Sequence, residues 1–183
     1  MSKLISEEEK YKGPRFNVVQ KIYEDENGKR YIRDCVNPGE AAVVLPITKD
    51  NEVVFVKQLR EAIGKIALEL PAGMVDEGED PIKTARRELQ EETGLIANTV
   101  EHLISVYPSS GYTSEKIHIY YAKDFEIGNQ KLDDTENIIS IEKIPIDRCL
   151  ELAKENYFEH ASQNIAILMY YFKYIIRRIR WKN

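Results

Sequence analysis

The segment from Gly73 to Leu95 crowds acidic side chains into a short span that also carries the start and stop signals of a helix. Asp80 can cap a helix N-terminus, and Pro81 follows it at the first helical position, where the missing N–H costs nothing. Gly94 suits the left-handed residue that commonly ends a helix. We therefore predict a helix between these signals. The residues expected on its buried side are Ile82, Ala85 and Leu89.

The glutamates of this helix fall together on one face. Glu88 and Glu92 are separated by four positions, and Glu91 lies beside them at i+3, a spacing at which like charges destabilise a helix by a few tenths of a kcal/mol per pair. Converging carboxylates suit a hard divalent cation, which prefers oxygen ligands. The preceding Leu-Pro-Ala-Gly loop can add a backbone carbonyl, because Gly73 lets the main chain approach closely. The alternative is a solvated acidic face, and spacing alone leaves both open.

Length and composition narrow the protein class. The chain has 183 residues and ordinary apolar content, which fits one domain with a small N-terminal appendage. A net charge of -5 argues against a general nucleic-acid binder. Cys35 and Cys149 are far apart and form no metal or redox motif, so we expect free thiols in a reducing compartment. We see no signal peptide and no apolar run long enough for a bilayer, so we expect a soluble, cytoplasmic protein with no membrane partner.

The remaining segments predict a mixed α+β fold. Strand patterns flank an Asn27-Gly28 turn and a second turn at Lys49 to Glu52, and a short strand precedes Pro71. Two further strands are expected over residues 114–125 and 136–145, and helices over 147–156 and from about Ser162 onward. The apolar side expected for the last helix is Ile165, Leu168, Met169, Phe172, Ile175, Ile176 and Ile179.

The acidic segment resembles a complete Nudix box, G-x5-E-x7-R-E-U-x-E-E-x-G-U, where U is a bulky aliphatic residue. The matching positions are Gly73, Glu79, Arg87-Glu88-Leu89, Glu91-Glu92 and Gly94-Leu95. The resemblance implies an α/β/α Nudix sandwich around a mixed sheet and divalent-metal-dependent cleavage of a nucleoside diphosphate linked to another group. It implies metal ligands at Glu88, Glu92 and the Ala72 carbonyl, with Glu91 as a further ligand or a group that positions water. It also implies that Arg87 orients a box glutamate and that Glu79 is structural.

The flanking sequence is similar to the ADP-ribose pyrophosphatase subfamily from the first hairpin to the final helix. Residues 107–115, Tyr-Pro-Ser-Ser-Gly-Tyr-Thr-Ser-Glu, resemble its Pro-rich Ser-Pro-Gly-x-Thr-Ser-Glu loop, with Ser110 where proline is usual. The resemblance implies hydrolysis of ADP-ribose to AMP and ribose 5-phosphate with magnesium, or manganese as the alternative. It also implies a homodimer, with residues 1–39 as a hairpin region used in dimerisation and 40–183 as the Nudix domain.

The subfamily also implies residues outside the box. A loop glutamate that serves as catalytic base and metal ligand falls on Glu136, with Asp134 as the alternative. Substrate contacts are expected from Arg60, whose fork suits phosphate oxygens, from Arg33 across a dimer interface, and from Glu115 and Met74. Candidates for an aromatic platform under adenine are Tyr11, Phe16 and Tyr112.

Three rival interpretations stay open at this stage. The substrate could be another nucleoside diphosphate sugar, a flavin or a dinucleotide, since Ser110 and Tyr112 would reshape the sugar pocket. A nucleotide-sensing regulator would normally carry a degraded box, which this chain does not. The basic tail from Tyr174 onward could bind a membrane surface, although we expect its apolar side to pack in the core.

Overall fold

The computed structural model describes residues 2–132 and 137–176. The chain divides into two compact units. The first comprises Met1–Glu40 with Tyr107–Lys116, and the second comprises Ala41–Val106 with Ile117–Asn183. The first unit is therefore built from two separate stretches of sequence.

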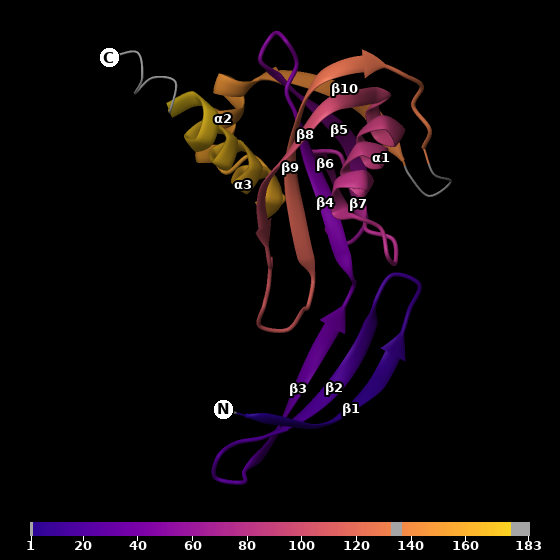
Figure 1. The fold of residues 1–183 in the computed structure, drawn as a ribbon, viewed down its shortest axis with the longest axis vertical. Helices are drawn as coiled ribbons and strands as arrows, with labels where there is room; N and C mark the ends of the chain where they lie inside the picture. The colour runs from indigo at the N-terminus through magenta and orange to yellow at the C-terminus, as the bar shows by residue number, and fades with distance from the viewer. Residues whose placement is uncertain (1, 133–136, 177–183) are drawn as a thin grey trace. The chain divides into compact units, whose positions relative to one another are not determined.

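The first unit is a three-stranded antiparallel sheet in the order β1-β2-β3 (Figure 1). Its strands are β1 (Lys3–Lys12), β2 (Asn17–Glu24) and β3 (Arg30–Asn37). The predicted hairpin of β2 and β3 is confirmed: Asp25 accepts backbone N–H bonds from Asn27 and Lys29, and Gly28 has a φ of 77°. The second stretch is joined to β3, because the Val36 N–H donates to the Tyr112 carbonyl at 2.8 Å.

The second unit contains two sheets. One has four strands in the order β7-β4-β9-β8, and the other has three in the order β10-β5-β6. The strands are β4 (Glu40–Pro46), β5 (Glu52–Arg60), β6 (Lys65–Glu69), β7 (Ala72–Met74), β8 (Leu95–Val106), β9 (Lys116–Ile127) and β10 (Ile138–Pro145). Every strand predicted in this region is present. The long strand β8 was not predicted, nor was β1 in the first unit.

Helices cover both faces of the four-stranded sheet (Figure 1). They are α1 (Pro81–Thr93), α2 (Ile146–Lys154) and α3 (Ala161–Tyr170), with α3 continuing as a π-helix over Tyr171–Ile176. Alternate residues of β4 point to opposite sides, as strand geometry requires. Val44 packs with α1, whereas Val43 and Leu45 belong to the larger core with β5, β6, α2 and α3. The predicted mixed α+β sandwich is confirmed.

The predicted apolar face of the last helix is confirmed only in part. Ile165 and Ile175 pack against the core, but Leu168 and Phe172 are 38% and 58% exposed, and Ile179 lies outside the described residues. The buried side is formed by Ser162, Gln163, Ala166, Ile167 and Tyr170. The segment is apolar on every side from Ile165 to Met169, so periodicity gives no unique direction. Its orientation is instead fixed by contacts such as the Gln163 side-chain N–H bond to the Leu68 carbonyl, 2.9 Å long.

The described residues include no helix with both the length and the apolar character needed to cross a bilayer.

Candidate active site

The helix α1 begins and ends where the sequence predicts. The Asp80 carboxylate accepts the Ile82 N–H at 3.1 Å, and Gly94 adopts a left-handed φ of 73° while its N–H donates to the Gln90 carbonyl at 2.8 Å. Ala85 and Leu89 are fully buried against the sheet. With both ends and the buried side fixed, the directions of the remaining side chains of α1 are fixed as well.

Two glutamates of α1 are buried despite their charge. Glu88 is 5% exposed and Glu92 is 2% exposed. Burying a carboxylate is costly unless charged or hydrogen-bonding groups surround it. A Cβ added to Gly73 would lie 1.9 Å from Glu88 Oε1, so the Glu88 carboxylate lies directly against the main chain of β7. Only glycine leaves room there, which explains why the box begins with this residue type.

Arg87 holds the box glutamates together. Its Nη1 donates to Glu88 Oε1 at 2.7 Å and to Glu91 Oε2 at 3.0 Å, while its Nη2 donates to Glu79 Oε2 at 3.3 Å. Burial by itself would lower the pKa of Arg87, but these carboxylates outweigh it and raise that pKa. Arg87 is therefore permanently charged, and it fixes the directions of three acids at once.

Glu79 supports the arrangement from outside the helix. The Thr84 hydroxyl donates to Glu79 Oε2 at 2.7 Å, and this bond, followed by the Arg87 contact, lowers the pKa of Glu79 although burial opposes the shift. Thr84 itself is fully buried. Glu79 thus joins the loop before α1 to the first turns of the helix, in keeping with its expected structural role.

A second arginine lies near the glutamates. Arg60, at the end of β5, donates through Nε and Nη2 to the carboxylate of Glu69 on β6, over distances of 2.6 to 3.0 Å. Burial would lower the pKa of Arg60, but the hydrogen bonds and charge of Glu69, with a contribution from Glu92, raise it. Arg60, Glu69 and Ala72 line one small cavity. The structure therefore brings Arg60 to the same part of the second unit as the box glutamates.

The donor set suits a hard divalent cation. Carboxylate oxygens of Glu88 and Glu92, with the Ala72 carbonyl beside Gly73, are the ligand types that magnesium and manganese accept. Among the described residues, no three His, Cys, Asp or Glu side chains converge closely enough to hold a metal by themselves. That statement covers neither backbone carbonyls nor residues 133–136, which lie outside the described residues. The Glu91 carboxylate is hydrogen-bonded to Arg87.

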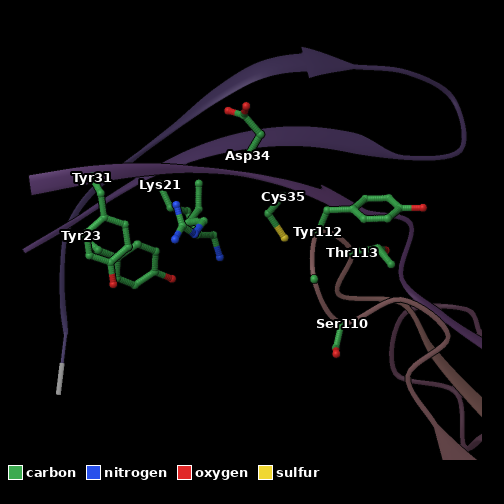
Figure 2. A pocket seen from close by; sticks show the side chains of 10 residues that line it. Lys21, Tyr23, Tyr31, Asp34, Cys35, Ser110, Tyr112 and Thr113 are labelled. Carbon is green, nitrogen blue, oxygen red and sulfur yellow. The ribbon is translucent and has the colours of Figure 1, made fainter.

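The first unit contains a cavity of about 370 Å³ (Figure 2). Tyr23 and Tyr31 stack at 5.7 Å between ring centroids, and the Arg33 guanidinium lies 4.7 Å from the Tyr31 ring centroid. Figure 2 shows these tyrosines on one side and Tyr112 on the other. The full lining is Lys21, Tyr23, Tyr31, Arg33, Asp34, Cys35, Ser110, Gly111, Tyr112 and Thr113. Cations and aromatic faces of this kind suit an anionic ligand that carries a planar ring.

Comparison with known proteins assigns the family. The family model of the NUDIX domain matches residues 37–163. This range includes the helix α1 and the arginines Arg60 and Arg87. The chain belongs to the NUDIX family. Nudix hydrolases generally depend on a divalent metal, which agrees with the donor set described above.

Individual relatives agree with this assignment. This Nudix protein is 29% identical to an ADP-ribose pyrophosphatase of Bacillus subtilis over 166 residues, 90% of each chain. It is 35% identical to a methanol dehydrogenase activator of Bacillus methanolicus over 142 residues, 77% of each chain. A crystal structure of an ADP compounds hydrolase matches the whole chain and 96% of its own, with a TM-score of 0.83 and 22% identity, and so supports the Nudix fold.

The residues predicted for the Nudix site fall in several places. Ala72, Met74, Arg60 and the box residues belong to the second unit, where the Met74 carbonyl accepts from Arg87 Nη2 at 3.3 Å. Arg33 and Glu115 belong to the first unit. Glu136 and its alternative Asp134 lie outside the described residues.

Sequence reasoning missed Glu69, which pairs with Arg60, and Gln58, which donates to Glu69. The available signal was a lone carboxylate within the apolar stretch Ile-Ala-Leu-Glu-Leu.

Proposed function

We propose that this Nudix hydrolase is an ADP-ribose pyrophosphatase, which hydrolyses ADP-ribose to AMP and ribose 5-phosphate. The observation that carries the proposal is the burial of Glu88 and Glu92, with the Glu88 carboxylate directly against the main chain of Gly73. Similarity to the Bacillus subtilis enzyme over 90% of both chains supports the choice of substrate.

The reaction is a hydrolytic phosphoryl transfer. The oxygen of a water molecule forms a bond to one phosphorus of the pyrophosphate, the bridging oxygen leaves with the other phosphate, and the protons of the water are taken up by a base and the products. Glu88, Glu92 and the Ala72 carbonyl would hold magnesium, or manganese in its place. When bound, such a cation neutralises phosphate oxygens and lowers the pKa of a coordinated water.

The chain's own residues bind and orient the substrate and the water. Arg87 holds Glu91 at 3.0 Å, which fixes that carboxylate for ligation or for a hydrogen bond to the attacking water. The exposed part of Arg60 binds a phosphate of the substrate, because a guanidinium suits phosphate oxygens. Glu136 is the proposed base, and Met74 and Glu115 contact the sugar end of the substrate. Arg33 is the proposed substrate contact supplied by the partner chain across the dimer interface.

We further propose a homodimer that works in the cytoplasm, in which residues 1–39 form the dimerisation region and residues 40–183 the catalytic domain. Every residue of β1 is exposed, and an open strand of this length is a surface on which a second chain can pair. The two free thiols suit a reducing compartment. Analytical ultracentrifugation tests the assembly. A dimer mass for the full chain and a monomer mass after deletion of residues 1–12 would support it. A monomer mass for the full chain at micromolar concentration would contradict it.

The substrate is tested by measuring turnover of a panel with magnesium present and AMP separated by chromatography. The panel contains ADP-ribose, a nucleoside diphosphate hexose, a flavin dinucleotide and a nicotinamide dinucleotide. We expect the highest kcat/KM for ADP-ribose, with equal release of AMP and ribose 5-phosphate, and no turnover after chelation of the metal. No preference for ADP-ribose over the nucleotide hexose would remove the specific assignment.

The alternative substrate is a dinucleotide. One relative, 35% identical over 77% of each chain, is named a methanol dehydrogenase activator and not a pyrophosphatase, so dinucleotides are kept in the panel beside ADP-ribose. Release of AMP and nicotinamide mononucleotide at a kcat/KM above that for ADP-ribose would select this candidate.

A further inference from the structure

Arg60 and Glu69 form an ion pair with several hydrogen bonds to one buried carboxylate. The Arg60 Nη2 lies 2.6 Å from Glu69 Oε2, and Nε lies 2.8 and 3.0 Å from the two carboxylate oxygens. Paired hydrogen bonds between a guanidinium edge and a carboxylate fix direction as well as distance. The Arg60 side chain is therefore held along one edge.

The two partners differ in exposure. The side chain of Glu69 is 5% exposed, whereas that of Arg60 is 39% exposed. Glu69 is held in turn by Gln58, whose side-chain N–H donates to Glu69 Oε2 at 3.0 Å and which is itself 8% exposed. A buried carboxylate with two such partners is a fixed support, and the arginine is the member of the pair that reaches toward solvent.

The hydrogen bonds of Arg60 among the described residues all use Nε and Nη2. Nη1 therefore keeps its two N–H donors for another group. The pair also borders the site, since Arg60 and Glu69 line one cavity with Ala72, and the charge of Glu92 acts on Arg60. This donor therefore borders the part of the second unit where the substrate phosphates are proposed to bind.

We propose that Glu69 is a positioning residue: by holding two nitrogens of Arg60, it directs the remaining guanidinium nitrogen to a phosphate of the substrate. The proposal rests on the proposed function, in which Arg60 binds the pyrophosphate. Ordering a long side chain before the substrate arrives removes part of the cost of binding. Gln58 extends the support by one residue, because it holds Glu69 in the direction that faces Arg60.

The test is a double-mutant cycle on kcat/KM with Glu69→Gln, Arg60→Ala and the double variant, using the best substrate of the panel. We expect Glu69→Gln alone to cost about 10- to 100-fold, the size typical of lost outer supports and of small misplacements. In the Arg60→Ala background the same change should cost less than about 2-fold, because there is no longer a guanidinium to position. Equal losses in both backgrounds would overturn the proposal.

A second readout separates positioning from a structural role. Added guanidinium ion should restore part of the turnover of Arg60→Ala, where Glu69 can hold it, but none of the turnover of the double variant. Equal rescue of both would overturn the proposal. If Glu69→Gln does not fold, as judged from thermal unfolding, Gln58→Met takes its place in both experiments, with an expected loss of about 10-fold that again disappears without Arg60.

A matched control is another ion pair formed by β5, with a glutamate of β10. Glu142 pairs with Lys57 of β5 at 2.5 Å, but both side chains are more than a third exposed. Glu142→Gln should change kcat/KM by less than about 2-fold, as expected for an exposed pair. Calorimetry of ADP-ribose binding to the same proteins without metal separates the proposed function from the proposed role of Glu69. Absence of any binding or turnover by the unmodified protein would remove the proposed function, whereas additive losses would remove only the role of Glu69.

Discussion

Two groups of neighbouring glutamates illustrate what distinguishes a candidate metal site from a charged surface. In β1, Glu7, Glu8 and Glu9 follow one another, and every residue of the strand is exposed. Their partners are surface groups: Glu8 pairs with Lys10 at 2.6 Å and Glu9 accepts from Asn17 at 3.0 Å. In α1, by contrast, Glu88 and Glu92 are buried, and a single arginine organises their neighbours.

The difference is not one of charge density. Both groups concentrate like charges, but only the second is withdrawn from water, where electrostatic interactions are strong and solvent does not screen them. Burial of Glu88 required a glycine opposite it and an arginine beside it, and the sequence supplies both within the same short segment. Acidic composition is therefore weak support for a metal site, whereas acids enclosed by such partners are strong support.

The largest expected effect comes from neutralising a buried member of the second group. Glu92→Gln keeps the shape of the side chain but removes its charge, so the donor set for a divalent cation is lost. We expect kcat/KM to fall at least about 100-fold, while thermal unfolding shows a cooperative transition like that of the unmodified protein. Turnover within a factor of about two of the original value would mean that this carboxylate does not hold the metal.

A smaller effect is expected when the space beside Glu88 is filled. Gly73→Ala introduces a methyl group 1.9 Å from Glu88 Oε1, so the carboxylate must move. We expect a loss of about 10- to 100-fold in kcat/KM and about 1–3 kcal/mol in the free energy of unfolding. Gly128→Ala is the matched control, since the close contacts of its new methyl group are with the end of the flexible Ile96 side chain, and the Gly94 carbonyl lies at an ordinary contact distance of 3.4 Å. Equal activity of the two variants would show that Glu88 tolerates displacement.

The third prediction concerns pH. The pKa of Glu79 is lowered by Thr84 and then by Arg87, so this carboxylate stabilises the folded state above its ordinary pKa of 4.5. That contribution is lost as pH falls through the lowered pKa of the folded state. Glu79→Gln should therefore cost about 1 kcal/mol in urea unfolding at neutral pH, as expected for such hydrogen bonds, and progressively less in acid. A cost that is constant with pH would argue against the ionised form of Glu79.

The smallest effect is expected on the exposed strand. Glu8→Gln breaks the ion pair with Lys10. The side chain of Glu8 is 71% exposed and that of Lys10 is 41% exposed. We expect a change within about 0.5 kcal/mol in the free energy of unfolding and unchanged turnover. A loss comparable to that of Glu92→Gln would erase the distinction between the two groups.

The sequence was sufficient where the signal is local. The ends of α1 followed from Asp80, Pro81 and Gly94, because caps act within one turn of backbone. The convergence of Glu88 and Glu92 followed from helical spacing alone. The hairpin of β2 and β3 likewise depends on residues that adjoin its turn.

Features that depend on distant residues were missed. β1 carries consecutive charges instead of an apolar alternation, and β8 is interrupted by Asn98, Thr99 and Glu101, so neither has the pattern of a half-buried strand. The role of Glu69 depends on strands β5 and β6 pairing so that Val56 is opposite Glu69 and Arg60 opposite Lys65. No property of Glu69 in the sequence predicts that register.

The divided construction of the first unit bears on how the protein is made. Val36 donates its N–H to the Tyr112 carbonyl and accepts the Ser114 N–H, so the outer edge of β3 is completed by residues that leave the ribosome only after α1 and β8. This edge of the amino-terminal sheet therefore stays unpaired while the helix α1 is synthesised. A nascent chain arrested before residue 107 should expose that edge to chaperones, and an isolated N-terminal fragment should make a poor autonomous module.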